Sequence, residues 1–240
     1  IIRLMKYLLS DIHANLTALR AVASSFELKR DDEIYILGDL IDYGMRPNEC
    51  ITFIQEHFSQ AIILQGNHEH ALLSHDDSRF SSQRGKNASK YTSEILTVEA
   101  HNFLKKMTRS KIRIHAGKSV LMVHGSLQDE LWGKIDTDVE ACEYRDFEIV
   151  ISGHTHRRHI FEKYIAGGSA ETSGKKKIRF VNPGAVGQPR NLNTCAQYAV
   201  CDDNWDNWQL RSVPYDIQQE LSLYHGEIDD FYKKRLQFGI

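Results

Sequence analysis

The first third of the chain repeats one unit, an apolar run followed by a polar loop and then an amphipathic segment. The apolar runs Arg3 to Leu9, Ile34 to Leu37 and Ala61 to Leu64 have the length and composition of buried strands. Apolar residues with helical spacing follow in 16–26 and 48–58. Parallel strands are joined by right-handed crossovers, so this rhythm predicts an α/β fold with a parallel sheet.

The second half is richer in strands, and no linker interrupts it. We expect one domain over 1–240 with two sheets. Residues 74–110 form an insertion, either a lid over a site or a packed surface hairpin, with helices at about 88–97 and 99–108. Short helices at about 216–238 end the chain, and 138–144 is also helical. The remaining predicted strands are Lys111 to His115, Ser119 to His124, Ile149 to Ser152, Arg158 to Ala166, Lys176 to Val181, Ala196 to Asp202 and Trp208 to Val213, with turns at Ala116-Gly117 and Gly167-Gly168.

Charge and cysteine content restrict the partners and the compartment. The net charge of -2 over 240 residues gives no basic field for nucleic acid or membrane. The basic run Lys175-Lys176-Lys177 fits a solvated hairpin tip better than an anion patch. Four cysteines without a CxxC pair, no apolar run of membrane-spanning length and no signal-peptide pattern before Ser10-Asp11 favour the cytoplasm.

Polar residues stand directly after the apolar strands, where ligands bind in open α/β sheets. The central one is Asp39, which follows Gly38 at the end of the Ile34 to Leu37 run. Carboxylate, amide and imidazole groups of this kind suit manganese, iron, zinc, nickel or magnesium. One carboxylate can bridge two such ions about 3.5–4 Å apart. The residues at these strand ends are Asp11 and His13, Asp39, Asn67 and His68, His124, and His154 and His156.

Each motif has an ordinary structural alternative when taken alone. Asp11-Ile-His13 could be a helix cap beside a surface histidine, and Asp39 could be a turn residue. An isolated His124 would usually be a hydrogen-bonded core histidine. Gly153-His-Thr-His156 is stronger, because alternate positions of an extended segment place both imidazoles on one side. The joint occurrence of the motifs, in order, favours a two-metal site.

These blocks resemble the signature motifs of calcineurin-like metallophosphoesterases, in particular the small single-domain microbial branch. Further similarity lies in Asp42 to Asn48, in Val181 to Arg190 and in Val213-Pro-Tyr-Asp216. The resemblance implies a four-layer αββα sandwich of two mixed sheets flanked by helices. The matching blocks are Asp11-x-His13, Gly38-Asp39, Gly66-Asn-His-Glu69, Val123-His-Gly125 and Gly153-His-Thr-His156.

The resemblance also implies roles for individual residues. A hydroxide bridging two divalent metals, with manganese the first expectation, would attack phosphorus in line with the leaving oxygen. His68 would protonate the leaving group or stabilise charge on the phosphate, and Asp42 would orient His68. One metal would be held by Asp11, His13, Asp39 and His156, and the other by Asp39, Asn67, His124 and His154.

Two departures from the family pattern bear on the substrate. Protein Ser/Thr phosphatases and symmetric diadenosine-tetraphosphate hydrolases usually carry phosphate-gripping arginines where this chain has Tyr43 and Gln65. Arg190 could supply a phosphate contact instead, or be structural, and Asn15 is a weaker candidate. We therefore expect a small phosphoester substrate, with nucleotides favoured and oligomeric state open. The alternatives are a phosphoprotein phosphatase or, less favoured because the ligand positions are filled, a silent protein-binding scaffold such as a retromer subunit.

Overall fold

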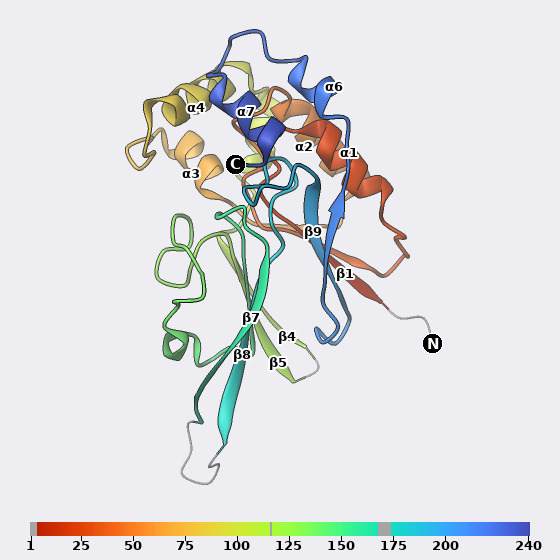
Figure 1. Ribbon diagram of the computed structural model, residues 1–240, viewed down its shortest axis with the longest axis vertical. Helices are drawn as coiled ribbons and strands as arrows, with labels where there is room; N and C mark the ends of the chain where they lie inside the picture. Colours follow the sequence, from red (N-terminus) through yellow and green to blue (C-terminus); the bar gives the residue numbers. More distant parts are fainter. Residues whose placement is uncertain (1–3, 116, 168–173) are drawn as a thin grey trace.

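Two five-stranded sheets stack on each other and enclose part of the core (Figure 1). The computed structural model describes residues 4–115, 117–167 and 174–240, so the predicted turns at Ala116-Gly117 and Gly167-Gly168 fall partly outside them. The first sheet has the order β10 (Gln209–Val213), β9 (Ala196–Asp202), β1 (Met5–Leu9), β2 (Glu33–Ile36) and β3 (Ile62–Ile63). The second has the order β4 (Ser110–His115), β5 (Lys118–Val123), β6 (Ile149–Ser152), β8 (Lys175–Asn182) and β7 (His159–Ala166).

Strand direction confirms the parallel arrangement expected from the repeating unit. β1 pairs parallel with β2, and β2 with β3. In the second sheet β5, β6 and β8 are also parallel, while β4 and β7 pair antiparallel at the two edges. In the first sheet β9 pairs antiparallel with both β1 and β10. Both sheets are therefore mixed, and the carboxyl ends of β1, β2, β5 and β6 are available for ligands.

The core lies in layers on both sides of the sheets. The outer face of the first sheet packs under helices α1 (Leu16–Ser24), α2 (Pro47–His57) and α5 (Val98–Leu104). Apolar side chains of β1, β2, β5, β6 and β9 meet between the sheets. The outer face of the second sheet is covered by the segment around the 3-10 helix η1 (Ala141–Tyr144), where a helix over 138–144 was expected.

The remaining helices gather at the end of the molecule where α1 and α2 also lie (Figure 1). α4 (Gln83–Ile95), α6 (Ile217–Leu221) and α7 (Phe231–Phe238) share a small apolar cluster, and α3 (Asn67–Ser74) lies nearby. α4 begins before the predicted position 88, because the Ser82 hydroxyl caps it by accepting from the Gly85 N–H. Among the described residues, no helix is long and apolar enough to cross a bilayer.

The basic run lies at the start of β8, at the end of the hairpin where β7 and β8 are joined, as expected for a hairpin tip, and Lys175 and Lys177 are exposed there. Lys176 pairs with Glu148 at 2.6 Å, and Lys177 pairs with Glu162 at 3.2 Å. Neighbouring carboxylates therefore balance much of this charge.

Candidate metal centre

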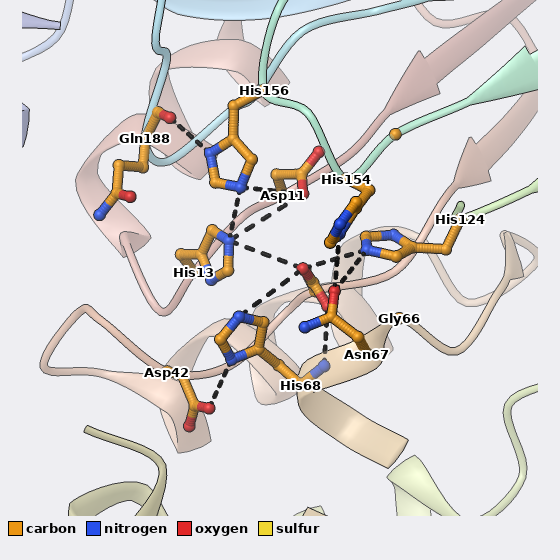
Figure 2. A network of polar contacts seen from close by, with 12 residues as sticks. Asp11, His13, Asp42, Gly66, Asn67, His68, His124, His154, His156 and Gln188 are labelled. Atoms are coloured by element: carbon orange, nitrogen blue, oxygen red, sulfur yellow. Dashed lines mark hydrogen bonds and ion pairs between the residues drawn. The ribbon is translucent and has the colours of Figure 1, made fainter. Parts of the chain in front are cut away.

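The predicted ligand residues meet at one point, where the carboxyl ends of strands from both sheets come together (Figure 2). Asp11 and His13 follow β1, and Asp39 follows β2. His124 follows β5, and Gly153 to His156 follows β6. Asn67 begins α3, which follows β3. The site thus lies on the seam between the two sheets.

The first ligand set offers two carboxylates and two imidazoles. Its candidate ligand atoms all lie within 4.8 Å of one another, and its members are Asp11, His13, Asp39 and His156. His156 Nε2 lies 3.2 Å from Asp11 Oδ1, and His13 Nε2 lies 3.8 Å from Asp39 Oδ2. All four side chains are buried.

The second set shares Asp39 with the first. Asp39 Oδ2 lies 3.1 Å from His124 Nε2. The side-chain oxygen of Asn67 lies 3.1 Å from His124 Nε2 and 2.9 Å from His154 Nδ1. Asp39 is the one carboxylate common to both groups, which is the arrangement that a bridging ligand requires.

Three of the imidazoles are oriented by backbone carbonyls. His13 Nδ1 donates to the carbonyl of Ile41 at 2.9 Å, and His124 Nδ1 donates to the carbonyl of Leu37 at 2.7 Å. His156 Nδ1 donates to the carbonyl of Gln188 at 2.6 Å. A carbonyl only accepts, so Nδ1 carries a proton in each of these rings. This is the usual outer hydrogen bond of a metal-binding histidine. Burial lowers the pKa of His13 and His156, so in these two rings Nε2 presents a lone pair to the site. The pKa of His124 is raised to about 9, because the neighbouring Asp39 carboxylate outweighs the effect of burial.

The arrangement of these ligand atoms favours bound cations. Nε2 of His13 and Nε2 of His156 face each other at 3.1 Å, although the Nδ1–H bonds make both of them acceptors. Neither carboxylate oxygen of the buried Asp11 accepts a hydrogen bond from the described residues. Hydrogen-bond acceptors that face one another with no donor between them repel, and a positive ion placed between them stabilises the arrangement.

Burial and the close approach of charged groups also shift the pKa values of these side chains. Burial and the neighbouring Asp39 charge raise the pKa of Asp11 to about 7. Burial would also raise the pKa of Asp39, but the imidazoles around it, His124 foremost, hold that pKa well below its usual range. Burial lowers the pKa of His13 and His156, and takes that of His154 to about 3, so these rings are neutral, as metal binding requires.

The backbones of two loops that carry candidate ligands lie very close to each other. Gly38 has φ +98°, and a Cβ there would lie 2.5 Å from the Gly66 nitrogen. A Cβ on Gly66 would lie 2.1 Å from Asp39 Oδ1. Both positions therefore require glycine. Several ligands themselves have positive φ, a conformation that costs free energy in any residue with a Cβ: Asp11 53°, His13 46°, Asp39 54°, His154 61° and His156 57°.

Glu69, which the sequence interpretation did not single out, fixes the loop that carries Asp39. Its buried carboxylate accepts from the N–H of Gly66 at 2.8 Å, of Asp39 at 2.9 Å and of Leu40 at 2.7 Å. The N–H of Ile41 adds a longer bond of 3.3 Å. Burial raises the pKa of Glu69 to about 7, whereas these donors favour its ionised form. Its place at the third residue of α3 was the available sequence signal.

His68 and Asp42 lie together beside the two ligand sets, as Figure 2 shows. His68 Nδ1 is 2.6 Å from Asp42 Oδ2, and His68 Nε2 is 4.0 Å from Asp39 Oδ2. Burial acts to lower the pKa of His68, but the charges of Asp39 and Asp42 outweigh it and raise that pKa. The ring is therefore biased toward the protonated form that a proton donor needs.

A cavity of about 810 Å³ opens onto this centre. Its walls include Asp39 and His68, the aromatic rings of Tyr43, Phe80 and Trp132, and several cationic side chains. The cationic residues are Arg79, Lys134, Arg157, Arg190 and Arg235.

The two predicted substrate contacts lie in different surroundings. Arg190 lines the cavity, and its N–H donates to the carbonyl of His156 at 3.2 Å. Asn15 caps α1, and its amide nitrogen donates to the Gly187 carbonyl and the Tyr215 hydroxyl. Substrate contact by either residue stays a prediction. Arg235, in α7, was not foreseen, because its approach depends on how that helix packs.

Comparison with known proteins agrees with this geometry. The profile of the calcineurin-like phosphoesterase superfamily domain matches residues 5–204. The structure of a metallophosphoesterase from Sphaerobacter thermophilus is similar with TM-score 0.79 and 26% identity, over 100% of both chains. An uncharacterized protein of Methanocaldococcus jannaschii is 27% identical over 99% of both chains. A symmetrical bis(5'-nucleosyl)-tetraphosphatase of Psychromonas ingrahamii is 23% identical over 73% of this chain, which matches 63% of that enzyme.

Proposed function

Because the chain belongs to the calcineurin-like phosphoesterase superfamily, we propose that it hydrolyses phosphate mono- or diesters, or nucleotide pyrophosphate bonds, with the help of two divalent cations. The observation that carries this proposal is the pair of ligand sets that share Asp39. When bound, the cations polarise phosphoryl oxygens and lower the pKa of the attacking water. Manganese is our first expectation for both positions, with iron, zinc, nickel and magnesium as alternatives.

The side chains around the cations have separate tasks. Asp39 sets the spacing between the two ligand sets, and the carbonyl-bound imidazoles keep their lone pairs aimed inward. His68, held by Asp42, gives a proton to the departing oxygen. Phe80 packs against His68 with ring centroids 4.9 Å apart and limits access of water to that proton.

We propose nucleotide-like substrates and a covering role for residues 74–110. Arg79, Phe80 and Ser81, which precede α4, line the cavity. An aromatic base fits rings such as Tyr43 and Trp132, and phosphates fit the cationic walls. Such a substrate would also agree with the tetraphosphatase relatives. A phosphoprotein phosphatase is the competing activity.

The test is an assay of manganese-loaded protein with p-nitrophenyl phosphate, bis-p-nitrophenyl phosphate, dinucleoside polyphosphates and phosphopeptides. Asp39→Asn should lower turnover at least about 100-fold, because Asp39 belongs to both ligand sets. It should also lower bound metal in elemental analysis, with the circular dichroism spectrum unchanged. The exposed Asp146→Asn is the matched control. Full turnover in Asp39→Asn would refute the assignment, and hydrolysis of phosphopeptides alone would favour the competing activity.

A further inference from the structure

Two arginines from distant parts of the chain meet in one wall of the cavity. Arg190 lies in the loop that follows β8, and Arg235 lies in α7. Both donate to the same oxygen, Gln188 Oε1, at 3.1 Å and 3.0 Å respectively. A neutral amide oxygen is thus the shared acceptor of two guanidinium groups.

The pair lacks a directly bonded carboxylate among the described residues, and the charges of Asp11 and Asp39 act on Arg190 from a longer distance. Among the residues that the structure describes, neither arginine makes an ion pair, and the buried Nε of each has no hydrogen-bond partner. Two other partly buried arginines do pair with carboxylates, Arg46 with Glu220 and Arg179 with Glu162. Burial and the neighbouring charge lower the pKa of Arg235 to about 10. Two adjacent cations without a directly paired anion are stabilised when a ligand supplies negative charge.

Backbone and ring contacts also fix the position of the two arginines relative to the candidate metal centre. The Arg190 N–H is bonded to the carbonyl of the ligand His156. Tyr232, one turn before Arg235 in α7, stacks on Tyr43 with ring centroids 4.4 Å apart and planes 18° apart. Tyr43 in turn contacts the ring of His68 at 4.6 Å. Both arginines line the same cavity as Asp39 and His68, so one cavity gives access to the arginine pair and to the candidate metal centre.

We propose that Arg190 and Arg235 bind a phosphoryl group that carries more than one negative charge, so that the protein prefers phosphate monoesters and nucleoside polyphosphates to simple diesters. The inference rests on the proposed function and refines its substrate class. Two guanidinium groups offer a fork of donors to the oxygens of a phosphate dianion. A simple diester carries one charge and gains less from the second arginine.

The experiment compares Arg235→Gln with Lys234→Gln, which removes the same charge from the neighbouring exposed position of α7. In calorimetric titration with inorganic phosphate, Arg235→Gln should bind phosphate at least about tenfold more weakly than wild type, and Lys234→Gln should bind it with unchanged affinity. The ratio of kcat/KM for p-nitrophenyl phosphate to that for bis-p-nitrophenyl phosphate should fall by a similar factor. Arg235→Lys should recover part of the phosphate affinity, and thermal melts check that each variant is folded.

Unchanged phosphate affinity in Arg235→Gln, or equal losses on the monoester and the diester, would overturn the inference while the hydrolase assignment stood. Failure of the metal-loaded wild-type protein to hydrolyse any ester would refute the proposed function instead. The two results are distinguishable, because phosphate binding is measured without turnover.

Discussion

The neighbours of His68 orient its ring for the proton-donor role that we propose. Asp42 accepts from its Nδ1, Phe80 and Tyr43 pack against its ring, and Nε2 is left facing Asp39 at 4.0 Å. This geometry lets the ring donate one proton toward the centre.

We expect His68→Ala to slow hydrolysis of an alkyl phosphate about 100-fold or more, because its alkoxide leaving group needs a proton. The loss with p-nitrophenyl phosphate should be much smaller, since p-nitrophenolate leaves unaided. Steady-state kcat on both esters makes the comparison. His70→Ala, in the same helix but outside the cavity, is the control. Equal losses on both esters would assign His68 to positioning alone.

At the residue scale the sequence was most informative where polar residues end apolar strands. The clustering of the candidate ligand residues was foreseen because parallel strands bring their carboxyl ends to one edge, whatever the length of the connections. Glu69 was missed because its partners, from Asp39 to Ile41, lie about thirty positions away in the chain. Arg235 was missed because nothing local in a basic terminal helix indicates which of its cations points inward.

Among the elements, the start of α3 holds together two loops of the metal centre. The Glu69 carboxylate receives four N–H groups from two chain segments, a set that one amide oxygen cannot satisfy. Glu69→Gln should therefore lower the free energy of unfolding by about 2–4 kcal/mol and weaken metal binding. Urea denaturation and metal titration measure the two effects. Glu94→Gln, on the exposed face of α4, should change neither, and an unaltered Glu69→Gln would show that the loop is held elsewhere.

The pairing of β1 with β2 has an electrostatic component that depends on pH. Lys6, almost completely buried, pairs with Glu33 at 3.0 Å, and Arg113 pairs with Glu33 at 2.6 Å. Burial acts to raise the pKa of Glu33, but these cations and the Tyr35 hydroxyl lower it below its ordinary value of 4.5. Stabilisation by Glu33 is therefore present above pH 4.5 and is lost as the pH falls through the folded-state pKa.

Accordingly, Glu33→Gln should cost about 1 kcal/mol at pH 7, and the difference from wild type should shrink toward zero in the acid range. Urea midpoints from neutral to acid pH provide the measurement. The exposed Glu56→Gln in α2 should follow the wild-type curve. A difference that stayed constant with pH would mean that packing, not charge, accounts for the loss.

For the whole molecule, the sequence predicted the two-sheet sandwich well and its outer covering less well. Apolar runs of strand length indicate the strands, as β9 illustrates, since the range predicted from the sequence, Ala196 to Asp202, is the observed one and is buried throughout. The segment around η1 forms a 3-10 turn where a longer helix was expected, because its shape follows the sheet under it and not its own periodicity. The packing of α7 on the cavity likewise depends on tertiary contacts.

Since candidate ligands from both sheets meet at the centre, we expect metal binding to stabilise the entire fold. At a manganese concentration of about 100 times Kd, the gain is about 2.7 kcal/mol, which corresponds to about 5–10 °C in Tm. Scanning calorimetry with manganese and with a chelator measures the shift, and Asp39→Asn should show almost none. An identical Tm in both conditions would mean that the wild-type site holds no ion.

The left-handed backbone at the ligand positions has a consequence for how such a chain can change over time. Asp11, His13 and Asp39 each hold a conformation that costs about 1 kcal/mol, and the approach of unpaired acceptors adds to this burden in metal-free protein. Glycine at one of these positions would relieve the strain. In a lineage no longer selected for catalysis, substitutions that remove these residues would thus increase the stability of the folded state. Only continued selection for activity would then keep the centre intact.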